Sequence, residues 1–174
     1  MRRIRFTALV LLLALSLSGC ISDPYETGVE ALKNKEYEEA AQNFEKAADK
    51  GKNTADSYRG LGIALWETED YEGAAEAFRK ALEEGTEKNA TIYNLLGSCE
   101  LKLGNAKEAI GYFEMGLAKD DLSGELEQEM RFNTIAAYEE QGDMEMAQKL
   151  LEEYVSDYPD DEEAAKEAEF LETR

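Results

Sequence analysis

The chain contains no histidine, only two prolines and only two cysteines among its 174 residues. Without histidine it lacks the commonest general base and the commonest transition-metal ligand, so we expect no enzyme, no metal site and no cofactor. Two prolines beside 13 glycines argue against a collagen-like or disordered chain. β-branched residues are sparse as well, while Glu, Lys, Ala and Leu dominate after residue 24, and this composition predicts an all-α protein.

Basic residues are also in short supply. The chain has 19 Lys and Arg against 39 Asp and Glu, which gives a net charge of −20. Three of the basic residues and none of the acidic ones lie in the first 19 positions, so a chain without that segment carries about −23. Phosphate repels such a chain, and we therefore expect no nucleic acid partner.

The first 19 residues differ in character from the rest. Arg2, Arg3 and Arg5 precede an apolar stretch, Phe6–Leu17, that is too short to cross a bilayer as a helix. This order, closed by small residues, is typical of an export signal that is removed. The residues Leu17–Cys20 resemble the bacterial lipobox, which implies that Cys20 is lipidated and becomes the mature amino terminus. The alternative is an ordinary secretory peptide cut near Gly19, with an incidental thiol after it.

A lipidated Cys20 would lie directly before the folded part of the chain. We assign residues 20–24 to the lipidated amino terminus and a short linker, which spans about 14 Å when extended and would hold the first helices near the membrane. The next residue is Ile21 rather than aspartate, so the inner-membrane retention mark of two-membrane bacteria is missing. We expect an exported protein anchored by lipid to a bacterial membrane, on the outer face of the cell membrane or on the outer membrane facing the periplasm.

One helical phrase recurs along the remaining chain. "EYEEAAQNFEKAADKG" begins at Glu36 and "DYEGAAEAFRKALEEG" begins at Asp70, which is 34 residues later. Related phrases occupy residues 105–117 and 143–155, and a second segment of helical periodicity precedes each of the four. Each unit is therefore predicted to be a helix, a short polar turn and another helix.

Small residues and one large residue recur at fixed places in these units. Two helices approach closely only where the residues at their crossing are small, so these places predict where the helices of a unit cross. The first helices carry Gly28, Gly62 and Gly97, with Ile135 at this place in the fourth unit. The second helices carry Ala40, Phe44 and Ala47, then Ala74, Phe78 and Ala81, then Ala109, Phe113 and Gly116, and finally Ala147, Leu151 and Tyr154.

On these residues the chain resembles the tetratricopeptide repeat family. The second unit carries most of the signature, in Tyr58, Leu61, Gly62, Leu65, Tyr71, Ala74, Phe78 and Ala81. The resemblance implies a right-handed α-solenoid of about four repeats over residues 25–159. Asp121, Leu122 and Ser123 are predicted to form a longer connection into the fourth unit, and residues 160–174 a capping helix with Ala164, Ala168 and Leu171 on one side.

The resemblance also implies a binding scaffold, whose first helices line a groove that receives a peptide or a partner helix. The positions carried over are Arg59, Ile63, Trp66 and Glu67, then Asn94, Ser98, Leu101 and Lys102, and then Phe132, Ala136, Glu139 and Glu140. Trp66, the only tryptophan, is the strongest candidate for an anchor. Its alternative role is packing against a neighbouring helix or Leu32. Ile63, Ser98 and Val29 replace the asparagines of the family's chaperone-tail clamp, so we do not expect that activity.

The remaining motifs have structural explanations. Cys99 follows Gly97 on an amphipathic segment and is predicted to be a small core residue. The "GLG" at residues 60–62 lacks the third glycine of a dinucleotide site, and the acidic runs lack the spacing of a calcium loop. These features favour a non-catalytic adaptor in the cell envelope that binds a protein or peptide partner. A lipoprotein that presents a ligand or peptide, and a self-assembling envelope component, are the alternatives.

Overall fold

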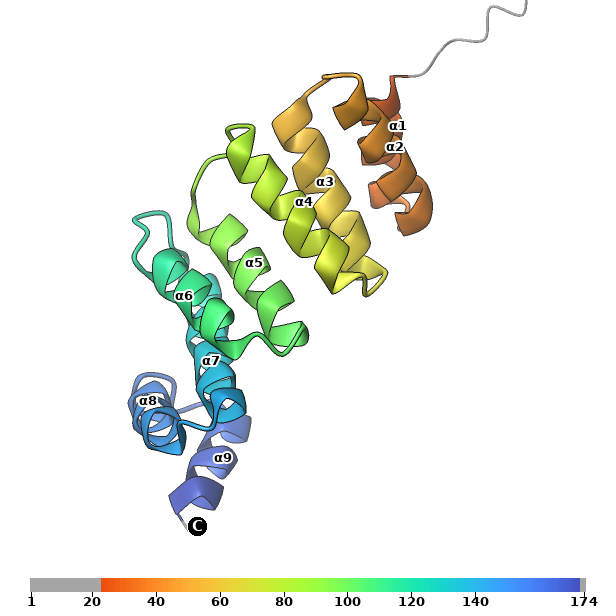
Figure 1. Cartoon of the computed structure of the whole chain (residues 1–174). Coiled ribbons are helices and arrows are strands. Elements are labelled where there is room, and N and C mark those ends of the chain that lie inside the picture. The colour runs from red at the N-terminus through yellow and green to blue at the C-terminus, as the bar shows by residue number, and fades with distance from the viewer. Residues whose placement is uncertain (1–22, 173–174) are drawn as a thin grey trace, which may run out of the picture.

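The computed structural model describes residues 23–172, and every regular element in this part is an α-helix (Figure 1). The helices are α1 (Pro24–Lys33), α2 (Tyr37–Asp49), α3 (Thr54–Glu67), α4 (Tyr71–Glu83), α5 (Ala90–Lys102), α6 (Ala106–Leu117), α7 (Gly124–Gln141), α8 (Met144–Asp157) and α9 (Glu162–Glu172). The expected signal segment and Cys20 lie outside the described residues. Within residues 23–172, no helix has the length and apolar character needed to span a bilayer.

The helices form consecutive antiparallel pairs that stack into a solenoid. Each helix packs against the next one in the chain, and the first helices of neighbouring units also touch, α1 with α3 and α5 with α7. In Figure 1 the chain advances from α1 at the upper right to α9 at the lower left, so the two ends of the described part lie far apart. Stability in such a fold comes from contacts within a unit and with its neighbours, as the repeated sequence predicts.

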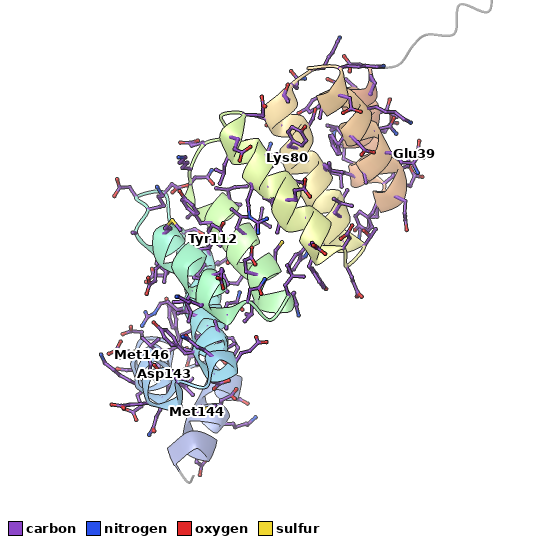
Figure 2. The ribbon with its side chains drawn as sticks, in the orientation of Figure 1. Glu39, Lys80, Tyr112, Asp143, Met144 and Met146 are labelled. Carbon is purple, nitrogen blue, oxygen red and sulfur yellow. The ribbon has the colours of Figure 1, made fainter. Side chains whose placement is uncertain are left out.

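Polar side chains fix where several of these helices begin. Asp70 accepts a hydrogen bond from the backbone N–H of Gly73 at 3.0 Å, and Asn89 accepts one from Ile92 at 3.1 Å. Asp143 does the same for Met146 at 3.1 Å, and Figure 2 labels both residues where α8 begins. These side chains satisfy backbone donors that have no partner inside the helix, and they explain why the polar turns end where they do.

Glycine and phenylalanine make the central contact of the first three units. A Cβ atom added to Gly62 would lie 2.5 Å from the ring of Phe78, and one added to Gly97 would lie 2.6 Å from the ring of Phe113. In the first unit, a Cβ atom added to Gly28 would lie 3.0 Å from the ring of Phe44. Each ring therefore rests on bare helix backbone, which is the close crossing that the sequence predicts.

The glycines of the "GLG" segment face two different units. Gly62 meets Phe78 of its own unit, whereas a Cβ atom on Gly60 would lie 2.6 Å from the ring of Phe44 in the preceding unit. Phe44 is 1% exposed between the first and second units, and Phe78 is completely buried. The two glycines thus serve packing within a unit and packing between units.

The fourth unit is built differently. Ile135, 3% exposed, occupies the place of the packing glycine and lies in a buried cluster with Ala147, Leu151 and Tyr154. In Figure 1, α8 is seen nearly along its axis, whereas α2, α4 and α6 are seen from the side. The second helix of this unit thus takes another direction, and a buried isoleucine stands where the other units have glycine.

The last helix covers the end of the fourth unit. Ala164 of α9 is fully buried in the cluster around Leu151, and Ala168 packs against the same cluster. Asp161 precedes the helix and accepts hydrogen bonds from the backbone N–H of Ala164 at 3.1 Å and from the Tyr154 hydroxyl at 2.8 Å. Ala164 and Ala168 therefore cover the fourth unit, as predicted for a capping helix. The side chain of Leu171 lies outside the described part of the chain.

A buried carboxylate joins the second and third units. Glu100 is 3% exposed and forms an ion pair with Arg79 of α4, and it accepts a hydrogen bond from Asn105 Nδ2 at 2.8 Å. Its two oxygens thus have partners, as a buried charge requires. Glu100 therefore fixes how α5 packs against α4.

Candidate functional site

The first helices line two neighbouring cavities. The first, which we call the α3–α5 cavity, has a volume of about 460 Å³ and lies between α3, the connection after α4, and α5. The second, which we call the Trp66 cavity, has a volume of about 390 Å³ and lies between α3, α5 and α7. The Trp66 cavity is lined by Trp66, Ser98, Leu101, Lys102, Glu129, Asn133, Ala136 and Glu140. Both cavities lie along the helices that the sequence assigns to a groove.

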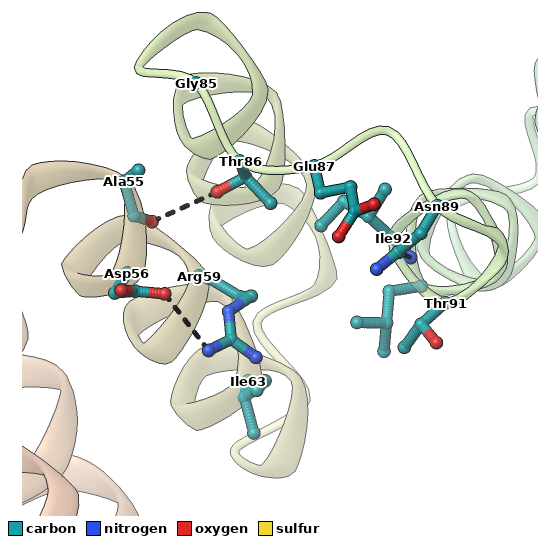
Figure 3. Close-up of a pocket in the computed structure, with 11 residues that line it drawn as sticks. Ala55, Asp56, Arg59, Ile63, Gly85, Thr86, Glu87, Asn89, Thr91 and Ile92 are labelled. Atoms are coloured by element: carbon teal, nitrogen blue, oxygen red, sulfur yellow. Dashed lines mark hydrogen bonds and ion pairs between the residues drawn. The ribbon is translucent and has the colours of Figure 1, made fainter. Parts of the chain in front are cut away.

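The α3–α5 cavity has an apolar side and a polar side (Figure 3). Ile63 and Ile92 contribute apolar surface, while Arg59 of α3 pairs with Asp56 across 3.1 Å between Nη2 and Oδ1. The side chains of this ion pair are 49% and 54% exposed, so the pair contributes little to stability and its charges stay accessible to a ligand. Thr86 donates to the carbonyl oxygen of Ala55 at 3.5 Å, which links the connection after α4 to α3.

Trp66 contributes both to packing and to the second cavity. Its ring meets the ring of Tyr71 edge to face, with centroids 5.0 Å apart, and packs against the buried cluster around Phe78 and Leu96. This side chain is partly buried, and it lines the Trp66 cavity together with Ser98 and Lys102. The indole therefore packs against its neighbours, as the alternative role predicts, and it also lines a cavity.

Asn94 lies deeper than a groove-lining residue. It is 7% exposed and donates through Nδ2 to Glu129 Oε1 at 2.9 Å. Its Oδ1 atom is buried and accepts no hydrogen bond from any described residue. A buried acceptor without a donor costs free energy. Asn94 thus holds Glu129 in position at the edge of the cavity and keeps one unused acceptor.

The charges of the Trp66 cavity are not neutralised by one another. Lys102, Glu129 and Glu140 line the same cavity, and none of them takes part in an ion pair within residues 23–172. With two carboxylates and one ammonium group, this part of the groove carries a net negative charge. It therefore favours a ligand that brings a positive charge.

Two predicted groove residues lie away from both cavities. Phe132 packs against the fourth unit, with its ring centroid 5.6 Å from that of Tyr154, and lines neither cavity. Glu139 also lines neither, and its Oε1 atom is buried without a partner among the described residues. Burial and the charge of Glu167 on α9 raise the pKa of Glu139. Both side chains face the last units of the solenoid.

Sequence reasoning missed two residues of the Trp66 cavity, Glu129 and Asn133. They lie on α7 at the helical spacing that leads to Ala136 and Glu140, so they share one face with them. Extending the predicted groove one turn towards the amino end of α7 would have identified both. The structure thus enlarges the predicted site by one helical turn.

Cys99 is a core residue, as predicted. It is completely buried, and this burial, with the nearby charge of Glu100, raises the pKa of its thiol to about 12. The thiol is therefore protonated at neutral pH and is a poor nucleophile. Among residues 23–172, no group of three or more side chains is arranged to hold a metal ion.

Solved structures share this arrangement of helices. A MamA chain from Desulfovibrio magneticus RS-1, comprising residue 41 to the end, is 20% identical with a TM-score of 0.74, and the match covers 87% of this chain and 82% of that chain. YrrB, described as a TPR protein with an unusual peptide-binding site, is 24% identical with a TM-score of 0.71, covering 85% and 74%. Another MamA structure is 17% identical with a TM-score of 0.73, covering 85% and 78%. At these identities the likeness concerns the fold alone.

Family models agree with the repeats seen in the structure. No curated protein sequence matches the chain significantly. One tetratricopeptide repeat model matches residues 25–88 and again residues 61–124, and a second matches residues 130–161. Together they cover the four helix pairs from α1 to α8. The chain belongs to the tetratricopeptide repeat family.

Proposed function

We propose that this chain is a membrane-anchored adaptor that binds an extended segment of a partner protein along α3, α5 and α7 in the bacterial envelope. A repeat scaffold of this family mediates protein interactions, and here the first helices present the side chains that packing leaves free. The observation that carries the proposal is the pair of neighbouring cavities on those helices.

Three features of the groove support a peptide ligand. Trp66 offers an aromatic surface that is already held by Tyr71, so little side-chain entropy is lost on binding. Lys102 and Ser98 can form hydrogen bonds with a peptide backbone, and Ile63 adds apolar surface in the adjoining cavity. YrrB, which has the same fold, is described as having a peptide-binding site.

The anchoring part of the proposal rests on the sequence. Leu17–Cys20 resembles a lipobox, and α1 begins at Pro24, so only residues 21–23 separate Cys20 from the first helix. A tether of this length keeps the first unit within about 14 Å of the membrane surface. A partner of the groove would therefore be another component of the envelope.

Metabolic labelling tests the anchor. We expect the full-length chain expressed in bacteria to incorporate an alkyne fatty acid and to fractionate with membranes, and we expect Cys20→Ala to abolish the labelling. Labelling that persists in Cys20→Ala, or an unlabelled wild-type chain, would refute a lipid at this residue.

Site-directed photocross-linking tests the groove. A photoreactive side chain placed at Lys102, in the Trp66 cavity, is expected to capture a defined envelope protein, and Trp66→Ala is expected to abolish the product. The matched control places the same group at Lys46, an exposed lysine of α2. The same products from both positions would show that capture does not depend on the groove and would contradict the proposal.

A further inference from the structure

The Trp66 cavity has an acidic rim. Glu129 and Glu140 line it from α7, and Lys102 is the only basic residue among its lining. The whole chain carries a net charge of −20, so no long-range field opposes a cationic ligand. A ligand that fills this cavity must therefore satisfy two carboxylates.

The hydrogen bonds around Glu129 leave acceptors unused. Asn94 Nδ2 donates to Oε1 of Glu129, yet a carboxylate offers about four lone-pair sites. Asn94 itself is more than nine-tenths buried, and its Oδ1 atom lacks a donor within the described part of the chain. This corner of the groove therefore has several acceptors and too few donors.

An aromatic ring completes the cavity. Trp66 lines it from α3, opposite the carboxylates of α7, and Tyr71 supports the indole from the side. A planar cation over a tryptophan face gains cation–π attraction, and arginine makes such contacts more often than lysine. Arginine also carries five N–H donors in a rigid fork that suits carboxylate pairs.

We infer that the partner segment inserts an arginine side chain into the Trp66 cavity, where the guanidinium lies against Trp66 and pairs with Glu129 and Glu140. The inference rests on the proposed function, because it names the chemistry of the peptide that the groove binds. Lys102 is left to donate to a carbonyl oxygen of the peptide next to the arginine. The carboxylates thus specify the partner, while the indole and Lys102 bind any extended segment.

Model peptides test this specificity directly. The probes are three acetylated and amidated nonapeptides of alternating threonine and valine, with arginine, citrulline or glutamate at the central position. Citrulline keeps the shape of arginine and removes its charge. Because Trp66 is the only tryptophan, its fluorescence in the purified full-length chain in detergent reports binding at this cavity. We expect the arginine peptide to bind at least about tenfold more tightly than the citrulline peptide, and the glutamate peptide to bind weakest.

Variants identify the groups that carry the preference. Glu129→Gln combined with Glu140→Gln is expected to remove the tenfold preference for arginine over citrulline. Glutamine still accepts a hydrogen bond from Asn94, and circular dichroism should show that the double variant stays folded. Glu39→Gln combined with Glu45→Gln, which removes two exposed carboxylates from α2, has the same charge change and should keep the preference.

The outcomes separate the inference from the proposed function. Equal affinity for the arginine and citrulline peptides overturns the arginine site and leaves peptide binding by the groove intact. A preference for arginine that survives in the double variant also overturns it. Failure of all three peptides to bind overturns it as well, and the cross-linking from Lys102 then decides whether the groove binds a protein at all.

Discussion

The first three units and the fourth unit close the same helix pair with different side chains. In the first three, a glycine on the first helix lies under a phenylalanine of the second, as Gly62 lies under Phe78. In the fourth, Ile135 and Leu151 take these places, and an aromatic group of Phe132 and Tyr154 packs beside them. All four units therefore share one topology, although different side chains lie between their two helices.

The comparison teaches that glycine is required only where a ring approaches the helix backbone. Gly111 of α6 has no atom within 4 Å of an added Cβ, although it lies in the same repeat as Gly97. Helix propensity alone would favour alanine at both positions. Glycine is needed at residue 97 because the ring of Phe113 contacts the helix backbone there. Nothing in the structure explains the glycine at residue 111.

The largest expected effect comes from giving the fourth unit the glycine of the others. Ile135→Gly removes a side chain that is 3% exposed, leaves a cavity between α7 and α8, and adds the helix penalty of glycine. We expect a loss of about 4 kcal/mol in the free energy of unfolding. Urea denaturation followed by circular dichroism measures this loss.

Trp66 fluorescence, a second probe, shows which units lose stability in Ile135→Gly. Trp66 reports on the second unit, and units of a solenoid depend mainly on their neighbours. In Ile135→Gly we expect the midpoint by Trp66 fluorescence to fall less than the midpoint by circular dichroism. Ile135→Val is the matched control, with an expected loss of about 1 kcal/mol. Coincident midpoints by both probes would mean that the four units unfold as one body.

The reverse change tests the glycine and phenylalanine contact. In Gly62→Ala the new methyl group would meet the ring of Phe78 at 2.5 Å, so the ring or the helix must move. We expect this overpacking to cost about 2 kcal/mol. Gly111→Ala, with open space around it, is expected to stabilise the chain by about 0.5–1 kcal/mol through helix propensity. Thermal unfolding of the two variants should shift in opposite directions, and a shift in the same direction would contradict the contact.

These contrasts show which features the sequence predicts. The spacing of Gly62, Ala74 and Phe78 encodes a crossing within one unit, which a reader of the sequence can recover. The contact of Gly60 with Phe44 and the burial of Asn94 under Glu129 join different units. These contacts depend on how the turns orient one unit against the next. The spacing of residues within a unit does not predict that orientation. The spacing of the repeat assigns Phe132 to the groove, yet in the structure its ring packs against Tyr154 of the fourth unit.

The turns inside the units provide a smaller test. Each turn between paired helices contains one residue with a positive φ angle. In the third and fourth units this residue is glycine, Gly104 and Gly142. In the first and second units it is Lys35, with φ of 63°, and Glu69, with φ of 62°. A side chain is strained in this region, although glycine loses more entropy on folding. We expect Lys35→Gly and Glu69→Gly each to raise the free energy of unfolding by about 0.5 kcal/mol. Chemical denaturation measures the gain, and Gly104→Glu should show the opposite sign.

The smallest expected effect concerns the junction of the fourth unit with α9. Glu100 faces Arg79 between the second and third units, whereas Glu139 of α7 faces Glu167 of α9. Burial and this like charge raise the pKa of Glu139, so the folded chain binds more protons than the unfolded chain between the ordinary carboxyl pKa and the raised one. The contribution of Glu139 to the free energy of unfolding therefore falls as the pH rises through that window.

Glu139→Gln should consequently stabilise the chain at neutral pH and have little effect at about pH 3, where both forms are uncharged. Glu140→Gln, an exposed neighbour with the same change of charge, is the control. Unfolding temperatures of the three chains at both pH values measure the difference. An equal gain at both pH values would assign the effect to packing, because only the charged form of Glu139 repels Glu167.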